Sequence, residues 1–478
     1  MKKITISRLF LYRRRFVIGY IVLVLAFVAL LFTLPLIAQD GLSSAEMESA
    51  TSSYHLTFDA PLHGDLVDLP YRLLQKISIL VFGFTAYTIK LPSIIIGLLF
   101  GILLILLLNR WFKNNVSLLA SCLVVLSTPF LFLAGSGTPL IMLAFWPTLL
   151  LWLGSKIQGE KRPKPMYSFL FAIALSMAIF TPYMLYFAIF CVIFVFLQPH
   201  LRFVLRSLPK LPLCITGAII LTGVGALVVN AINQPKIIEE LLLYKDFSLA
   251  NFGSNIVAGM EPVFRWFGGG ETIFLAPLIG LPVLALALVG LFSTTKGFFA
   301  SRNSIASLLI LFTIIITGIN PQAVVFIILP LSILTAHGLK YLLEKWYGLF
   351  PENPYARIAA LVPLTILFGI IIIPGLLQYV YGYHYNSKVA SQFDYSLEIV
   401  RQTLTDETLV VDQNYDFYKI LEDKTELKVV DKAENIQTER VAFLHTMAED
   451  TSLSLTRIIT SPMKENSDII YLYTKKGE

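Results

Sequence analysis

The segment 39–88 holds the densest group of titratable side chains that could do chemistry. Its two Lys or Arg residues are Arg72 and Lys76, and its acids are Asp40, Glu46, Glu48, Asp59, Asp65 and Asp68, with His63 between Asp59 and Asp65. A positioned carboxylate can take a proton from a hydroxyl group as a general base. Carboxylate and imidazole groups are also ligands for divalent cations. The segment is therefore the first place to look for an acid–base or metal site.

Asp40 is the acid that stands closest to an apolar run, two residues after the run 16–38 ends. The stretch Ser43-Ser44-Ala45-Glu46 that follows has the pattern of a capping box, so we expect a short helix to begin there. The positive end of a helix dipole favours an ionised carboxylate nearby. Asp40 could therefore act as a base at the membrane surface. Residue chemistry alone favours the simpler role of ending the apolar run and helping to cap the helix, because surface carboxylates are common.

The stretch from Asp59 to Asp68 combines carboxylates with His63 and could hold a divalent cation or a metal-bound phosphate. Its spacing matches no tight metal motif. Pro61 and Gly64 are turn residues, and they explain the same stretch as a loop. Both interpretations stay open, with Asp59 and His63 as the candidate ligands.

A second polar segment, 233–272, contains the cations Lys236, Lys245 and Arg265 and a glycine run at 268–270. Cations of this kind can hold a lipid phosphate. Trp266 has an alternative role as an anchor at the membrane interface, beside a flexible turn. Lys245 and Arg265 are the candidates for phosphate binding here.

The composition indicates the class of protein in which these polar segments are held. The chain has 478 residues, of which 56% are apolar and 14% charged, with a net charge of +6. A soluble domain is usually about 45–50% apolar and about 25% charged. The excess excludes a soluble enzyme and predicts a polytopic membrane protein. The three cysteines, Cys122, Cys191 and Cys214, all lie in apolar runs, and this excludes a disulfide framework and a zinc motif.

About eleven apolar runs are long enough to cross a membrane or nearly so. They are 16–38, 89–108, 117–134, 139–154, 167–180, 183–197, 211–232, 273–292, 304–318, 321–339 and 358–380. Lys and Arg gather at the N-terminus and in alternate loops, a topology signal that also argues against a nucleic-acid partner. The sequence therefore predicts a cytoplasmic N-terminus, an extracytoplasmic C-terminus and a location in the cell membrane. Segments 39–88 and 233–272 become outer loops.

The sequence changes from mainly apolar to mainly polar near residue 383. We expect a transmembrane domain over 1–382 and a small extracytoplasmic α/β domain over 383–478, with strands near 408–411, 427–430, 441–444 and 469–473. Helical patterns lie between some of these strands, at Leu397, Val400 and Leu404 and at Tyr418 and Leu421. In the first outer loop, an apolar stripe over 71–82 predicts a helix that lies along the membrane surface. The fold class is all-α polytopic with this small α/β domain.

Several motifs in this order carry a family resemblance. They are Leu69-Pro70-Tyr71-Arg72-Leu73-Leu74, Leu80-Val81-Phe82-Gly83, Lys90-Leu91-Pro92-Ser93-Ile94, and the late stretch from Asn320-Pro321 through Pro330-Leu331 and Ala336 to Gly338-Leu339. With the long first outer loop and the outer C-terminal domain, the chain resembles the GT-C-type integral membrane glycosyltransferases. That group includes the protein O-mannosyltransferases and the lipid A aminoarabinose transferases.

The resemblance implies transfer of a sugar, with inversion, from a polyprenyl-phosphate-linked donor to a hydroxyl of a lipid, glycan or protein acceptor on the outer face. Position by position, it implies that Asp40 is the catalytic base and that Asp59, in Phe58-Asp59-Ala60-Pro61, contributes to phosphate or metal binding. Asp68, Lys245 and Arg265 are the other candidates for the substrate phosphate. The sequence leaves open whether a divalent metal cofactor is needed.

Three positions depart from the pattern of the group. Many relatives carry an Asp where this chain has 137–140, a Lys where it has 181–183, and an Arg where it has Gln322 or Ala323. Two alternatives also remain. A glycan polymerase or ligase would require Arg265 and dispense with Asp40, and a non-catalytic envelope-assembly or lipid-carrier protein would depend on residues 390–478.

Overall fold

The structure is a computed structural model of the whole chain. It describes residues 14–37, 41–56, 66–159, 165–243, 248–264, 280–295, 300–349, 361–404, 407–411, 414–422, 425, 427–431, 440–445, 447, 452–460 and 469–475. The account below concerns these residues.

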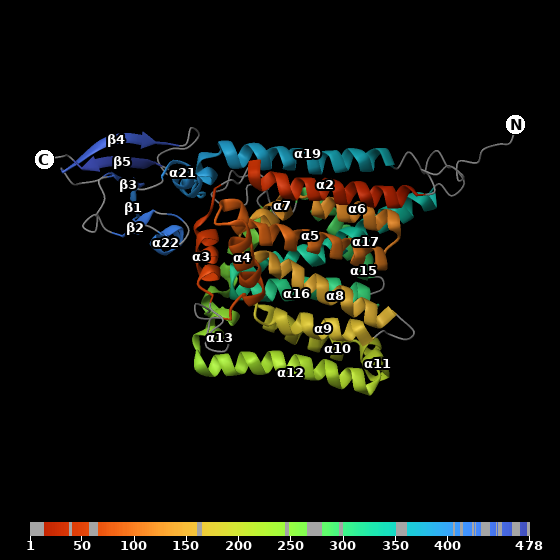
Figure 1. Cartoon of the computed structure of the whole chain (residues 1–478). Helices are drawn as coiled ribbons and strands as arrows, with labels where there is room; N and C mark the ends of the chain where they lie inside the picture. The colour runs from red at the N-terminus through yellow and green to blue at the C-terminus, as the bar shows by residue number, and fades with distance from the viewer. Residues whose placement is uncertain are drawn as a thin grey trace.

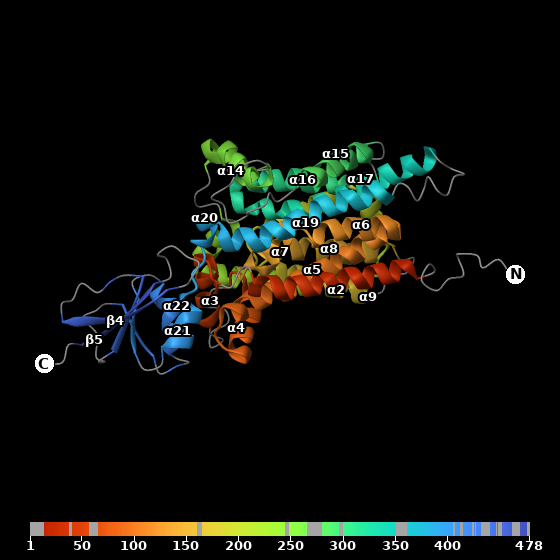
Figure 2. The ribbon, with the colours of Figure 1, turned by 90° about the horizontal axis from the view of Figure 1, so that it is seen from above.

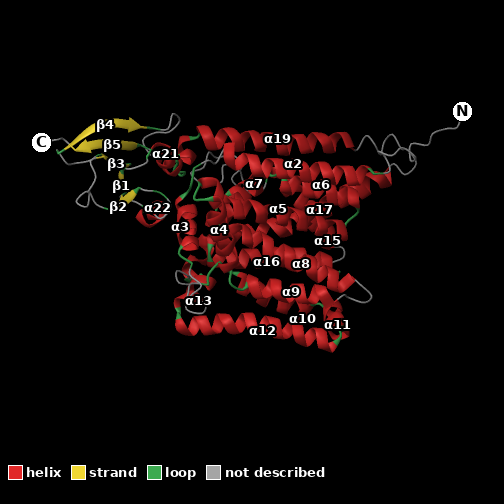
Figure 3. Ribbon diagram, in the orientation of Figure 1, coloured by secondary structure: helices red, strands yellow, loops and turns green. Residues whose placement is uncertain are grey.

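A bundle of roughly parallel and antiparallel helices forms most of the molecule, and all the strands belong to the C-terminal domain at one end of it (Figures 1 and 3). The long helices of the bundle are α2 (Arg15–Ile37), α5 (Ala86–Trp111), α8 (Met142–Gly159), α12 (Lys210–Asn233), α16 (Ser301–Ile319), α17 (Ile328–Leu349) and α19 (Leu361–Tyr385). The shorter ones are α6 (Asn114–Val125), α7 (Thr128–Gly135), α9 (Pro165–Ala178), α10 (Met184–Leu197), α11 (Pro199–Ser207) and α15 (Leu281–Thr295).

Every apolar run predicted from the sequence coincides, over its described part, with a helix or with a bent pair of helices. Seven helices in the described residues are long and apolar enough to span a membrane, and counting each bent pair as one span raises the number to 9. The pairs are α6 with α7, bent by 60°, and α10 with α11, bent by 95°. Two shorter apolar helices, α9 and α15, complete the predicted set. The chain is a multi-pass membrane protein.

Close packing inside the bundle depends on small residues, as is usual between membrane helices. α15 and α17 approach so closely that a Cβ at Gly290 would collide with the backbone carbonyl of Leu334. A Cβ at Gly338 would collide in the same way with the carbonyl of Leu286. Gly338, part of the late motif in the sequence, is therefore required by helix contact.

Two helices of the first outer loop cover the end of the bundle that faces the C-terminal domain (Figure 2). They are α3 (Ser44–Tyr54) and α4 (Leu69–Phe82). The predicted capping box is confirmed, since Glu46 N–H donates to Ser43 Oγ and Ser43 N–H donates to Glu46 Oε2 at 2.7 Å. Leu74, Ile77 and Val81 of the predicted stripe on α4 are exposed, as a helix lying on a lipid surface requires.

Further short helices connect these parts. They are η2 (Pro139–Ile141), α13 (Lys236–Leu242), η3 (Leu249–Asn251), α14 (Phe252–Phe264), η4 (Pro321–Ile327) and α20 (Ser387–Ala390). η4 and α13 lie at the same end of the bundle as α3 and α4, because each adjoins the cavity described below.

The C-terminal domain is a five-stranded sheet in the order β2-β1-β3-β5-β4, with β1 parallel to β2 and β3, and β5 antiparallel to β3 and β4. Its elements are α21 (Ser396–Thr403), β1 (Thr408–Val410), α22 (Tyr415–Glu422), β2 (Lys428–Val430), β3 (Arg440–Leu444), β4 (Leu453–Ile459) and β5 (Ile470–Lys475). Four strands and both helices match the prediction. β4 was not predicted because it is an edge strand with mostly exposed side chains and no buried run.

The sheet domain is fastened to the first outer loop. Leu42 and Asp394 exchange backbone hydrogen bonds of 2.8 and 2.7 Å, and Glu398 Oε1 accepts from the N–H of Ala86 at 3.1 Å. The rings of Phe84 and Phe417 pack 5.0 Å apart in a core that α3, α21 and α22 share. The residues that follow Asp40 are thus clamped between the bundle and the sheet.

Asp394 anchors this attachment through its side chain. Burial alone would raise the pKa of Asp394, but hydrogen bonds from His445 and Ser396 outweigh it and hold the pKa below the ordinary value of 3.8. Tyr418 Oη also donates to its carboxylate at 3.0 Å. Because the folded pKa is lowered, the ionised group stabilises the attachment above pH 3.8, and this stabilisation is lost as pH falls through the folded value.

We expect Asp394→Asn to weaken the attachment by about 1.5–3 kcal/mol, the usual range for hydrogen bonds to a charged group. The measurement is hydrogen exchange at the amide of Leu42, which should become faster at neutral pH. Asp416→Asn, on the exposed face of α22, is the matched control and should leave the exchange unchanged. Equal protection in wild type and Asp394→Asn would contradict the proposed anchoring role.

Candidate active site

A cavity of about 300 Å³ opens at the end of the bundle that carries α3 and α4. Its wall is built from α3, the start of α4, η2 and α8, the connection between α9 and α10, and the start of η4. The lining residues are Ala45, Glu48, Ser49, Ser52, Asp68, Arg72, Thr138, Pro139, Leu140, Leu143, Thr181, Pro182, Tyr183, Leu243 and Gln322. This set brings the first outer loop together with segments that lie 66 to 277 positions later in the chain.

Asp68 is the predicted site residue that the structure places in this cavity. It precedes α4 in a left-handed conformation with φ 53°, and its N–H donates to the carbonyl of Phe180 at 2.8 Å. The residue is 8% exposed. The hydrogen bond ties the start of α4 to the connection between α9 and α10, so the carboxylate is held at the junction of two cavity walls.

Arg72 lies one helical turn after Asp68 and also lines the cavity. Its N–H donates to the carbonyl of Asp68 at 2.9 Å, within the first turn of α4. Arg72 is the one Lys or Arg among the described residues of the cavity wall. A guanidinium carries five donors in a fixed plane and is suited to a phosphate group. Among these residues it is therefore the group best suited to a phosphate.

The side chain of Gln75 connects the helices that form the cavity wall. Its side chain is fully buried and donates to the carbonyls of Ile89 and Gly137 at 3.0 and 3.1 Å. It also accepts from Ser49 and Ser53 of α3 at 2.9 and 2.6 Å. One amide thus fastens α3, α4, α5 and the segment before η2 to each other.

A buried ion pair lies behind α3. Glu46 and Lys90 are each 1% exposed, with Lys90 Nζ 3.9 Å from Glu46 Oε1. Glu46 Oε1 also accepts from the N–H of Gly137 at 2.6 Å, and Lys90 donates to the carbonyl of Gly41 at 2.5 Å. The pair therefore fixes both Gly41, the residue after Asp40, and Gly137, the residue before the cavity-lining Thr138.

The predicted site residues divide into two groups. Asp68 lines the cavity, whereas Asp40, Asp59, His63, Lys245 and Arg265 lie outside the described residues. Two of them adjoin described parts of this region, because Asp40 precedes the clamped Gly41 and Lys245 follows the cavity-lining Leu243 by two residues. In the described part of the chain no group of three or more His, Cys, Asp or Glu side chains could hold a metal ion.

The three stretches in which the sequence departs from the resembled group all meet at this cavity. They contribute Thr138, Thr181 with Tyr183, and Gln322 to its wall. This chain therefore presents neutral side chains at the three places where the resemblance would lead one to expect an Asp, a Lys and an Arg. Trp146 donates to Thr181 Oγ1 at 3.1 Å, so this neutral wall is itself an ordered polar arrangement.

Sequence reasoning missed Arg72 as a site residue and Lys90 and Glu46 as a buried pair. In the sequence, Arg72 is simply a polar residue outside the apolar stripe of α4. The capping box already explains Glu46, so nothing in the sequence indicates a second role for it. Lys90 offered the clearest signal, because a Lys inside a long apolar helix must find a partner.

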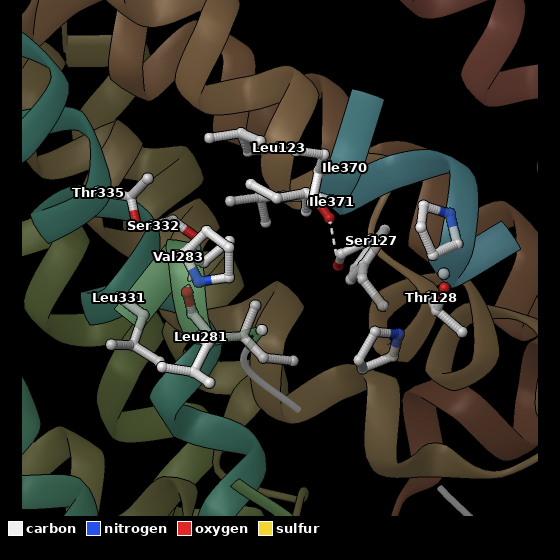
Figure 4. A pocket seen from close by; sticks show the side chains of 18 of the residues that line it. Leu123, Ser127, Thr128, Leu281, Val283, Leu331, Ser332, Thr335, Ile370 and Ile371 are labelled. Carbon is white, nitrogen blue, oxygen red and sulfur yellow. Dashed lines mark hydrogen bonds between the residues drawn. The ribbon is translucent and has the colours of Figure 1, made fainter. Parts of the chain in front are cut away.

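A second cavity, of about 390 Å³, is mainly apolar (Figure 4). Leu123, Leu281, Val283, Leu331, Ile370 and Ile371 contribute to its wall, from α6, α15, α17 and α19. η4 contributes to both cavities: Gln322 lines the polar one and Ile327 the apolar one.

Comparison with known proteins agrees with this layout. Residues 70–225 match the sequence profile of the dolichyl-phosphate-mannose-protein mannosyltransferase family. A search of curated protein sequences finds no match.

Solved structures match over nearly the whole chain. ArnT from Cupriavidus metallidurans bound to undecaprenyl phosphate matches with a TM-score of 0.54 at 14% identity, covering 95% of this chain and 98% of ArnT. Its apo state gives a TM-score of 0.56 with the same identity and coverage. The archaeal oligosaccharyltransferase AglB from Archaeoglobus fulgidus, in complex with an inhibitory peptide and a dolichol-phosphate, matches with a TM-score of 0.54 at 10% identity, covering 91% of this chain and 70% of AglB.

These findings confirm the family resemblance and the fold class predicted from the sequence. The chain has the fold of the GT-C-type integral membrane glycosyltransferases, and its residues 70–225 match the sequence profile of a mannosyltransferase family.

Proposed function

We propose that the chain transfers a sugar from a polyprenyl-phosphate-linked donor to an acceptor hydroxyl at the outer face of the cell membrane, with inversion and with Asp40 as the base. The observation that carries the proposal is the polar cavity that Asp68 and Arg72 line, at the bundle end where the chain emerges after Asp40. The ArnT structure with undecaprenyl phosphate and the AglB structure with a dolichol-phosphate support a lipid phosphate as the donor's carrier.

In this mechanism the acceptor hydroxyl gives its proton to the Asp40 carboxylate while its oxygen attacks the anomeric carbon of the sugar. The bond from that carbon to the phosphate oxygen breaks, and the electron pair leaves with the polyprenyl phosphate. One displacement inverts the anomeric configuration. The products are the glycosylated acceptor and the free lipid phosphate.

The leaving phosphate needs positive charge nearby as the bond breaks. Arg72 supplies it in this proposal, since the three other wall stretches contribute neutral side chains. The apolar cavity, to which η4 also contributes, receives the first part of the isoprenoid tail in this proposal, and the polar cavity receives the sugar phosphate. Lys245 and Arg265, and a divalent ion held by Asp59 and His63, stay predictions.

We expect Arg72→Gln to lower the transfer rate by about 100-fold, the usual effect of removing one donor that stabilises developing charge. Arg72→Lys keeps the charge without the planar fork and should retain part of the activity. Arg401→Gln, on the exposed side of α21, is the matched control and should behave as wild type. The measurement is transfer of labelled sugar by membranes with equal amounts of each variant. Wild-type transfer by Arg72→Gln would remove Arg72 from the site.

Lipid analysis tests the function itself. In cells without the gene, mass spectrometry of extracted lipids should reveal a polyprenyl-phosphate sugar that accumulates and that disappears when the wild-type gene is restored. An unchanged set of lipid-linked sugars would contradict the proposal.

Deletion of residues 390–478 separates the alternatives, because residual turnover by the truncated chain favours a transferase over a partner-binding assembly protein.

A further inference from the structure

A third cavity, of about 790 Å³, lies among helix ends at the opposite side of the bundle from the sheet domain. Figure 1 shows α11 at this end, across the bundle from α3, α4 and the sheet. The wall comes from the end of α5, the second half of α8, α9, α10, the start of α11 and the start of α16. Sequence topology makes this the cytoplasmic side, and the proposed transfer chemistry does not use it.

The lining of this third cavity is amphipathic. Its basic side chains are Arg110, Arg302 and His200, and the described lining includes no Asp or Glu. The deeper wall is apolar and aromatic, with Phe171, Phe190 and Phe194 among its residues. A basic rim over an apolar interior complements a molecule with an anionic head and a hydrocarbon tail.

The two arginines are held in place at the rim by helix carbonyls. Arg110 Nε donates to the carbonyl of Ser155 at 3.0 Å, and Arg302 Nη1 donates to the carbonyl of Trp111 at 2.7 Å. Each guanidinium has five N–H donors. One N–H donor holds each guanidinium in place, and its other N–H donors can bind a phosphate. The Arg302 guanidinium also lies 5.9 Å from the centroid of the Phe112 ring, which limits its motion.

α11 indicates that the third cavity lies at the depth of the lipid headgroups. It turns by 95° from α10 and carries exposed Phe203 and Leu205 beside Arg202 and Arg206. A short helix with this composition lies along a membrane interface. His200 and Leu201 of the same helix line the cavity. The cavity therefore sits at headgroup depth, where basic pockets between membrane helices bind anionic lipid heads.

We propose that this third cavity is a binding site for an anionic phospholipid, with its phosphate held by Arg110 and Arg302 and an acyl chain among Phe171, Phe190 and Phe194. The volume lies within the roughly 300–1,000 Å³ of ordinary ligand pockets. The bound lipid ties α5, α8, α10 and α16 together. This role is structural and does not depend on the proposed sugar transfer.

Gly154 offers a way to close the site without disturbing the helices. It lines the third cavity, and a Cβ built on it meets no heavy atom within 4 Å. Gly154→Phe should therefore fill the space from α8 with an aromatic ring while leaving both arginines in place. This variant separates loss of the cavity from loss of charge.

Native mass spectrometry of the purified full chain, titrated with phosphatidylglycerol or with phosphatidylcholine of the same acyl chains, tests the proposal. Wild type should bind phosphatidylglycerol at least tenfold more tightly than phosphatidylcholine. Arg110→Gln with Arg302→Gln should remove that preference, and Gly154→Phe should weaken binding of both lipids at least tenfold. Arg202→Gln with Arg206→Gln, two exposed cations of α11 outside the cavity wall, is the matched control and should keep the preference.

Equal binding of the two lipids by wild type would overturn the proposal, as would an equal loss in the α11 control. Undecaprenyl phosphate that displaced phosphatidylglycerol, and that depended on the same two arginines, would assign the site to the lipid carrier and overturn the phospholipid assignment. Arg110→Lys with Arg302→Lys, which preserves the charge, should keep a measurable preference. Unchanged binding of phosphatidylcholine by the Gln variants shows that their loss of preference is not misfolding.

Discussion

Asp40→Asn is expected to reduce sugar transfer by about 100-fold or more while leaving the amount of protein in the membrane unchanged. A positioned general base contributes about 10²–10⁴-fold to a rate. Asn has nearly the same shape as Asp but does not accept the proton of the acceptor hydroxyl. The measurement is the level of the lipid-linked sugar in cells that depend on each variant, and Asp40→Asn should match the cells without the gene.

The matched control for this change is Asp416→Asn, which removes an exposed carboxylate of α22 and should restore normal lipid levels. Retained transfer by Asp40→Asn would show that Asp40 only ends the first membrane helix. If Arg265→Gln abolished transfer and Asp40→Asn did not, the chain would fit a glycan polymerase or ligase instead.

Lys90→Met is expected to cause the largest loss of stability. It would leave the carboxylate of Glu46, 1% exposed, without the cation that lies 3.9 Å away. Removing one partner of a buried ion pair typically costs about 3–5 kcal/mol. The measurement is the free energy of unfolding in detergent, followed by the near-ultraviolet signal. Lys419→Met, on the exposed side of α22, should change it little.

The same change should also reduce transfer per folded molecule, by up to about 100-fold, because small displacements of catalytic groups are costly. Lys90 donates to the carbonyl of Gly41, and loss of that bond frees the segment that carries Asp40. Adding Glu46→Gln to Lys90→Met should recover much of the stability, since the buried charge is then gone, but not the tether to Gly41. Full recovery of both stability and transfer would contradict the positioning role of Lys90.

The fold was predictable to a large extent because membrane helices leave a strong signal. The described part of each apolar run is mainly helical. The break at 126–127 and the bend before α11 change only how the runs are divided into helices. The capping box at Ser43 and Glu46 was predictable because it is local. β4 was missed because an edge strand with exposed side chains has no buried run to reveal it.

The candidate site was less predictable, because its residues meet only through tertiary contacts. Sequence reasoning named Asp68 but gave it no neighbours, whereas the fold places it beside Arg72, Thr138, Thr181 and Gln322. The Glu46–Lys90 pair joins residues 44 positions apart, and the capping role of Glu46 already accounted for that residue locally. Asp40 as the base rests on its position in the resembled family and stays a prediction.

Cross-linking of a photoactivatable undecaprenyl phosphate to the purified chain tests the central claim most directly. The account predicts labelled peptides from the two cavities that η4 helps to line, including 138–143, 181–183 and 370–378, and weaker labelling of Arg72→Gln. Labelling confined to the opposite end of the bundle, or equal labelling of wild type and Arg72→Gln, would contradict it.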